Sequence, residues 1–123
     1  CKYAFLPHNS GFSAESVIRP AYELNVPAII TEGVKEIEPL VKVDRANIIV
    51  EAVKACEDAE NAYIVRVYES EGVRTNALIS FPESVKSVTP VNMLEEKTGD
   101  PIIANKVDTS FRPFEIKTFK VSY

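Results

Sequence analysis

The sequence predicts an all-β fold, an antiparallel β-sandwich of the immunoglobulin-like type with about eight to nine strands. Short runs of β-branched and aromatic residues, in which apolar and polar positions alternate, indicate half-buried strands. Turn residues separate these runs. The length of 123 residues is that of one domain, and 46% hydrophobic residues are enough for a core without disulfides or metals.

The middle of the chain holds the clearest strands, at residues 48–55, 62–70 and 73–81. We expect a short hairpin at Glu71 and Gly72 between the last two strands, because glycine takes a positive φ at little steric cost. The alternation in these two strands predicts a shared core, made of Tyr63, Val65, Val67, Val73, Ala77 and Ile79.

Further strands are expected towards both ends of the chain. They are residues 2–6, 28–32, 39–43, 87–94 and 100–105, with a closing strand within residues 110–123. Pro90 places the run that contains it at a sheet edge or a bulge. One short helical turn is predicted near residues 13–19, capped by Ser13. Pro20 is expected to end it, because proline removes a helical hydrogen bond.

Composition and charge exclude several classes of partner. The net charge is −4, the isoelectric point is about 5.1, and the basic residues are scattered, so neither nucleic acid nor an anionic membrane surface is expected as a partner. No apolar run approaches the ~20 residues of a membrane helix. The two cysteines, Cys1 and Cys56, are expected to be free thiols, and the sequence contains no Asn-x-Ser/Thr glycosylation site. Both observations favour a cytoplasmic protein. The start at Cys1 reads as that of a fragment.

The sequence shows no combination of residues that is typical of a catalytic or metal-binding site. His8 is the single histidine, and no carboxylate stands near it at ligand spacing, so no metal site and no catalytic triad are expected. Glu69 and Glu71 flank a turn and read as exposed carboxylates. Four isolated glycines do not form a phosphate-binding loop. We therefore expect no catalytic residue, no bound cofactor and no metal in this chain.

Six segments in order carry a family resemblance. They are YAFLPH (3–8), AYELNVP (21–27), NIIVEAVKACED (47–58), YIVRVYESEGVRT (63–75), MLEE (93–96) and PFEIKT (113–118). Together they resemble the C-terminal β-sandwich domain of the family 38 glycoside hydrolases, the α-mannosidases. The resemblance covers nearly the whole chain and is weakest over residues 29–45.

The resemblance implies that residues 1–123 are a single C-terminal accessory domain, a fragment of a larger enzyme that hydrolyses α-mannosidic bonds in glycans. In that family, zinc and an aspartate nucleophile belong to an N-terminal catalytic domain, so no catalytic or zinc-binding residue is carried over to this chain. The implied partners are the catalytic domain of the same polypeptide and the parent's glycan substrate. The alternatives are a non-catalytic carbohydrate-binding module and a structural immunoglobulin-like module.

A candidate interdomain contact follows from the alternation in residues 62–70. Ile64, Arg66 and Tyr68 occupy the face opposite the expected core and are not the polar residues that water alone would favour. Arginine can pair with a carboxylate while its stem covers apolar surface, which suits a partly polar domain interface. The alternative is an internal layer, in which a segment such as residues 13–25 covers this face.

Overall fold

The computed structural model describes residues 3–9, 11–30, 32–33 and 37–123. The chain divides into two compact units, Cys1–Ile37 and Glu38–Tyr123, and each is described by itself. The second unit holds all the strands of the structure as described. The expectation of one domain over residues 1–123 stays a prediction.

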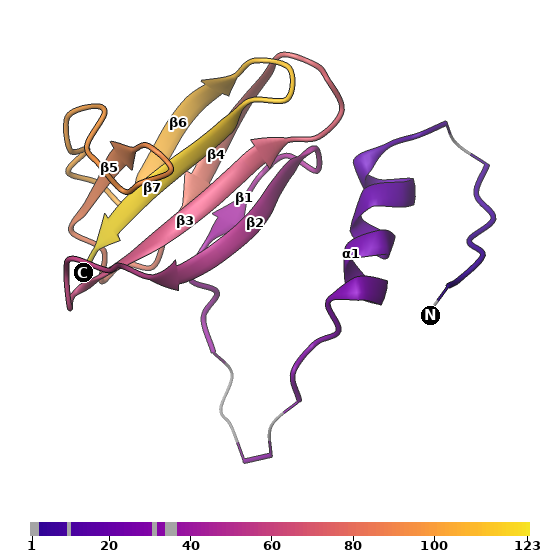
Figure 1. The fold of residues 1–123 in the computed structure, drawn as a ribbon, viewed down its shortest axis with the longest axis horizontal. Helices are drawn as coiled ribbons and strands as arrows, with labels where there is room; N and C mark the ends of the chain where they lie inside the picture. The colour runs from indigo at the N-terminus through magenta and orange to yellow at the C-terminus, as the bar shows by residue number, and fades with distance from the viewer. Residues whose placement is uncertain (1–2, 10, 31, 34–36) are drawn as a thin grey trace. The chain divides into compact units, whose positions relative to one another are not determined.

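The second unit is a β-sandwich of two antiparallel sheets (Figure 1). The three-stranded sheet has the order β1 (Lys42–Val43), β4 (Thr75–Ser80) and β6 (Lys106–Phe111). The four-stranded sheet has the order β2 (Ile48–Ala55), β3 (Ala62–Glu69), β7 (Ile116–Ser122) and β5 (Ser87–Val91). The predicted fold class is confirmed, with seven strands in the described residues in place of eight to nine.

The core lies between the two sheets. Val65 and Val67 of β3 are fully buried there and belong to one cluster with Ala77 and Ile79 of β4. Burial of each valine or isoleucine side chain contributes about 1.5–3 kcal/mol to stability. The predicted core is confirmed at these positions and at Tyr63, but it is wrong at Val73, which precedes β4 and is 48% exposed.

The segment between β3 and β4 is not a hairpin, contrary to the prediction. The two strands belong to different sheets, so this segment carries the chain from one layer of the sandwich to the other. Gly72 has a φ of +74°, as expected for glycine at a sharp turn. Alternation along the two strands places their side chains correctly, but it does not say which strands pair.

Several predicted strands are absent or shorter. Of residues 2–6 and 28–32, the described positions 3–6, 28–30 and 32 form no strand, while Lys2 and Thr31 lie outside the described residues. The range 39–43 is reduced to β1, and 87–94 is reduced to β5. The range 100–105 contributes one bridge, between Ile102 and Val88. Apolar sequence alone does not make a strand, because a strand also needs a neighbour with matching backbone hydrogen bonds.

The closing run is two strands and not one. β6 ends at Phe111, a turn follows in which the Glu115 N–H donates to the Arg112 carbonyl over 3.0 Å, and β7 begins at Ile116. Pro113 stands at the second position of this turn, and Phe114 follows with a φ of +58°. Proline followed by a positive φ is typical of a type II turn, which separates the two strands.

The described residues of the first unit contain one helical segment, a five-residue π-helical turn at Ala14–Ile18 that continues into α1 (Arg19–Asn25). The prediction of Ser13 as the cap is confirmed, since its side chain accepts a hydrogen bond from the Ser16 N–H over 3.1 Å. The prediction that the helix ends at Pro20 is wrong. Pro20 lies in the first turn of α1, directly after the wider π-helical turn, and proline is accepted at the start of a helix. No described helix is long and apolar enough to cross a membrane.

Candidate functional site

The residues expected to contact another domain lie on the outer face of the four-stranded sheet. Ile64, Arg66 and Tyr68 alternate along β3, so all three point away from the core between the sheets. Ile64 is 1% exposed, whereas Arg66 and Tyr68 are half-buried. Ile64 is therefore covered on this face, and Arg66 and Tyr68 are the two of these residues that remain accessible.

Arg66 is held in place by β7. It lies opposite Thr118 in the ladder, and its Nε donates a hydrogen bond to Thr118 Oγ1 over 3.4 Å. No ion pair between described residues involves Arg66. A guanidinium group has five N–H donors, and the hydrogen bond to Thr118 uses one of them. Arg66 can therefore donate further hydrogen bonds to a carboxylate from outside this unit.

Part of the outer face is crossed by the loop that follows β5. Glu95 in this loop forms an ion pair with Lys54 of β2 and accepts hydrogen bonds from Cys56 Sγ (3.6 Å) and the Glu57 N–H (3.3 Å). β5 and β2 are opposite edges of the sheet, so the loop passes over the end where Lys54 pairs with Ile64. The hydrogen bond between Lys54 and Glu95 raises the pKa of the lysine and lowers the pKa of the glutamate.

Exposed apolar side chains flank the accessible part of this face. Ile116 lies opposite Tyr68 in the ladder and is 51% exposed. Met93, in the loop after β5, is 60% exposed and lines the same groove as Ile116. Apolar side chains beside an arginine are a common composition at interfaces between domains and between proteins.

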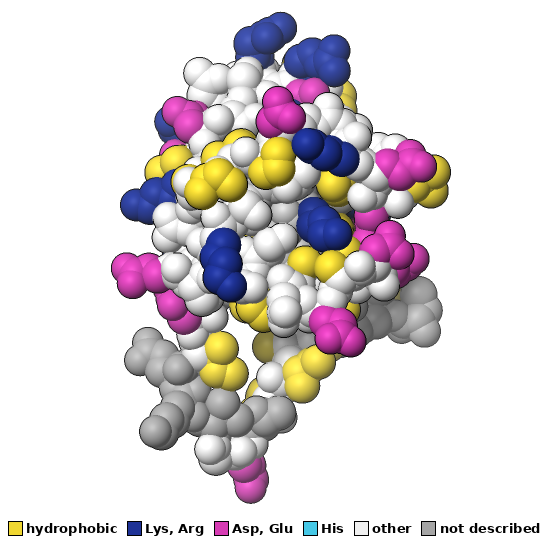
Figure 2. Space-filling model, turned by 90° about the vertical axis from the view of Figure 1, so that its left-hand side faces the viewer, with side chains coloured by type: hydrophobic (Ala, Val, Ile, Leu, Met, Phe, Trp, Pro, Cys, Tyr) yellow, Lys and Arg dark blue, Asp and Glu magenta, His cyan; other side chains and the backbone are white. Residues whose placement is uncertain are grey.

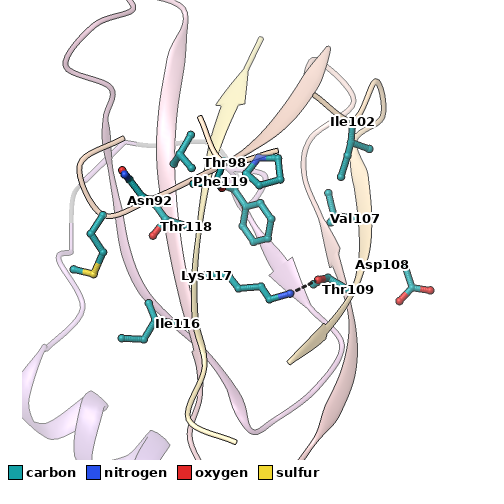
Figure 3. A pocket seen from close by; sticks show the side chains of 13 residues that line it. Asn92, Thr98, Ile102, Val107, Asp108, Thr109, Ile116, Lys117, Thr118 and Phe119 are labelled. Carbon is teal, nitrogen blue, oxygen red and sulfur yellow. Dashed lines mark hydrogen bonds between the residues drawn. The ribbon is translucent and has the colours of Figure 1, made fainter. Parts of the chain in front are cut away.

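A groove opens beside this face because β5 stops short. β5 pairs with β7 only as far as Val91 opposite Thr118, so Ile116 and Lys117 at the start of β7 have no neighbour in β5. The groove has a volume of about 490 Å³ and is lined by side chains of β5, β6 and β7 and of the loop between β5 and β6 (Figure 3). Its apolar lining includes Val91, Ile102, Val107 and Phe119.

Lys117 crosses this groove from β7 to β6. Its Nζ donates hydrogen bonds to Thr109 Oγ1 and to the Ser110 carbonyl, each over 2.8 Å, and lies 5.0 Å from the ring centre of Phe111. Figure 3 shows Lys117 directed towards β6, while Ile116 points to the opposite side of β7. Lys117 was not predicted as a site residue from the sequence. The available signal was the alternation of the closing strand, which places this lysine on the face of Phe119.

A buried carboxylate joins the loops at one end of the sandwich. Glu69 is fully buried, so the expectation of an exposed carboxylate is wrong here. Its two oxygens accept five hydrogen bonds of 2.8–3.2 Å, donated by Asn47 Nδ2 and by the backbone N–H groups of Glu71, Gly72, Val73 and Phe114. Burial by itself raises the pKa of Glu69, but these hydrogen bonds outweigh it and hold the pKa below its ordinary value. A carboxylate so fully occupied is structural rather than catalytic.

The described residues do not provide the donor set of a zinc site. No group of three or more histidine, cysteine, aspartate or glutamate side chains among them could hold a metal ion. We therefore derive no metal chemistry for this chain. On the face shown in Figure 2, acidic and basic side chains are interspersed with small groups of hydrophobic ones.

Comparison with known proteins agrees with this architecture. The family described as "Glycosyl hydrolases family 38 C-terminal beta sandwich domain" matches residues 47–119, a range that contains β2 to β6 and the first part of β7. No solved structure shows a significant match.

Three relatives match nearly the whole chain. α-Mannosidase G of Dictyostelium discoideum is 33% identical over 96% of this chain and 12% of its own length. α-Mannosidase 2C1 of Mus musculus is 24% identical over 94% of this chain and 12% of its own length. An α-mannosidase of Saccharomyces cerevisiae is 27% identical over 99% of this chain and 14% of its own length. The chain thus spans only a small part of the relatives that it matches.

Proposed function

Because this chain belongs to the C-terminal β-sandwich domains of the family 38 glycosyl hydrolases, we propose that it acts as the accessory domain of a longer α-mannosidase polypeptide. The observation that carries the proposal is the match over residues 47–119, together with relatives named α-mannosidase that are several times longer than this chain. The parent polypeptide would hydrolyse α-mannosidic bonds in glycans. Its zinc and its catalytic residues would lie in another domain.

The proposed role of the sandwich is to pack on the catalytic part of the same polypeptide and support it. The contact would use the outer face of the four-stranded sheet, through Arg66 and Tyr68 with Ile64 beneath them. Three features support this choice: the absence of an ion pair to Arg66 among described residues, the half-buried Tyr68, and the exposed Ile116 opposite it. A carboxylate on the catalytic part would complete the hydrogen bonding of Arg66.

We also infer a cytoplasmic location for the parent. Two observations support it: Cys56 is a free thiol in the structure, and the sequence has no Asn-x-Ser/Thr site. Expression of the full polypeptide with a fluorescent tag would test this. Co-localisation with a secretory or lysosomal marker would contradict it.

Activity measurements on three proteins test the main proposal. They are the longer polypeptide, the same polypeptide without this domain, and the 123-residue chain alone, each assayed on an aryl α-mannoside. We expect turnover from the first, strongly reduced turnover or poor folding of the second, and none from the third. Full activity after deletion of the domain, or turnover by the chain alone, would contradict an accessory role.

A further inference from the structure

One strand edge of the sandwich has backbone groups that face outward. β6 pairs with β4 on one side and lies at the edge of the three-stranded sheet. The Phe81 N–H donates to the Asn105 carbonyl over 2.9 Å, which makes these two residues a hydrogen-bonded pair. In an antiparallel ladder such pairs alternate, so the backbone groups of Val107 and Thr109 face β4 and those of Asp108 face away.

Two further hydrogen bonds agree with this alternation. The Leu78 N–H and carbonyl, opposite Asp108, are directed to the other side of β4, where they bond Asp44. The Ser110 carbonyl is reached from outside the sheet by Lys117 Nζ. The outward set on β6 is therefore Lys106, Asp108 and Ser110. Within the described part of the chain, the hydrogen bond from Lys117 Nζ to the Ser110 carbonyl is the one that the backbone of this set forms.

The groove described above lies along the same edge. Val107, Asp108 and Thr109 of β6 form one of its walls, and β5 and β7 form the other. A strand added beside β6 would therefore place every second side chain over the groove and against its apolar lining. Lys117 uses two of its three N–H donors on β6, so a third remains for a carbonyl of the added strand.

An unpaired strand edge beside an apolar groove is the arrangement that binds an extended peptide by strand addition. The occupant must be an extended segment with apolar residues at alternate positions. The relatives have 86–88% of their length outside the matched region, since the match covers 12–14% of them. A segment on the same polypeptide binds at a high effective concentration and needs little intrinsic affinity.

We propose that the edge of β6 and the adjoining groove receive an extended segment from the remainder of the α-mannosidase polypeptide, which adds a fourth strand to the three-stranded sheet. This inference rests on the proposed function, because it takes the longer polypeptide as the source of the segment. It adds a second contact, through backbone hydrogen bonds, to the contact proposed at Arg66.

Hydrogen exchange of the wild-type protein is the primary test. The peptide covering residues 106–111 is compared between the 123-residue chain and the longer polypeptide. The amides of Asp108 and Ser110 should exchange quickly in the chain alone and about tenfold or more slowly in the longer polypeptide. Equal exchange in the two proteins would overturn the inference. So would slow exchange already in the chain alone, or a dimer of the chain in solution that protects these amides.

Two substitutions at Asp108 distinguish the contribution of its backbone N–H from that of its side chain. Asp108→Pro removes an N–H that faces away from β4, so it should leave the unfolding temperature of the 123-residue chain nearly unchanged. In the longer polypeptide it should abolish the protection of Ser110. Asp108→Ala keeps the N–H and serves as the matched control, with protection retained. Loss of protection in both variants, or in neither, would contradict strand addition.

Deletion of the domain and hydrogen exchange of β6 together distinguish a failure of the strand addition from a failure of the accessory role. If deletion of the domain impairs the longer polypeptide but the β6 amides stay unprotected, only the strand addition fails. If deletion has no effect on folding or turnover, the accessory role itself fails.

Discussion

The carboxylate of Glu69 accepts a hydrogen bond from the backbone N–H of Phe114 over 3.0 Å, although the two residues are 45 positions apart in the chain. This contact joins the end of β3 in the four-stranded sheet to the turn between β6 and β7, which links the two sheets. The same carboxylate also binds the loop that leads into β4. One buried side chain therefore fixes the geometry of this end of the sandwich.

Glu69→Gln should lower the free energy of unfolding of the chain by about 2–4 kcal/mol, because the amide keeps only one acceptor oxygen and turns an NH₂ donor towards backbone N–H groups. Urea denaturation measures the difference. Glu83→Gln, at an exposed position, is the matched control and should change stability by less than about 0.5 kcal/mol. Equal effects of the two substitutions would show that the hydrogen bonds of Glu69 contribute little.

The stability of the chain should depend on pH in the acid range. The pKa of Glu69 in the folded chain lies below its ordinary value of 4.5. As the pH falls, the unfolded chain therefore binds the proton first, and the contribution of Glu69 is complete above about pH 5 and decreases below pH 4.5. Unfolding curves between pH 3 and pH 7 should show a smaller acid decrease for Glu69→Gln than for the wild type. Parallel decreases would assign the effect to other carboxyl groups, such as Glu95 and Glu115, whose pKa values are also lowered.

The burial of Glu69 could have been read from the sequence in part. Tyr63, Val65 and Val67 alternate on the core face of β3, and Glu69 continues this series. The alternation thus placed the carboxylate inward, while its position beside a turn suggested exposure. What the sequence does not contain is the identity of its hydrogen-bond donors, since Phe114 comes from a turn far along the chain.

Gly72→Ala should destabilise the chain by about 1–2 kcal/mol, because the φ of +74° is unfavourable for alanine. An added Cβ would also lie 2.7 Å from the ring of Phe114. The double variant Gly72→Ala/Phe114→Ala should recover the steric part of this loss but not the backbone part. Gly11→Ala, where a Cβ would meet nothing within 4 Å, is the control and should have little effect on thermal unfolding. A neutral Gly72→Ala would mean that the turn takes another conformation.

Val65→Ala and Val73→Ala form a matched pair that tests the corrected core. Val65 is fully buried, so its truncation should cost about 1–3 kcal/mol from lost transfer energy and a residual cavity. Val73 is 48% exposed, so the same truncation there should cost less than about 0.5 kcal/mol. Chemical denaturation of the two variants compares the costs directly. Equal costs of about 1–3 kcal/mol at both positions would instead support the core expected from the sequence, in which Val65 and Val73 are both buried.

The candidate surfaces show where prediction from sequence ends. Period-two alternation placed Arg66 and Tyr68 on the outer face, because alternation along one strand is local. It could not show that Ile64 is buried, since that depends in part on the loop that carries Glu95 to β2. The groove was not predictable either. It exists because β5 ends at Val91 while β7 continues, and strand ends depend on pairing between distant segments.

Arg66→Glu tests the proposed contact on the outer face. In the longer polypeptide it should weaken packing of the domain and lower α-mannosidase turnover, because a carboxylate that pairs with Arg66 would then face a like charge. The 123-residue chain should still fold, since Arg66 makes one long hydrogen bond, to Thr118, and no ion pair among the described residues.

The control for this substitution is Arg74→Glu, which makes the same change of charge at an exposed position outside the proposed contact. It should leave both turnover and unfolding temperature close to those of the wild type. Turnover of the longer polypeptide and thermal unfolding of the chain are measured for both variants. If Arg66→Glu unfolds the chain as severely as it impairs the longer polypeptide, Arg66 stabilises its own sheet, and the docking face must lie elsewhere. If it impairs only the longer polypeptide, and Arg74→Glu does not, the outer face of β3 carries the contact.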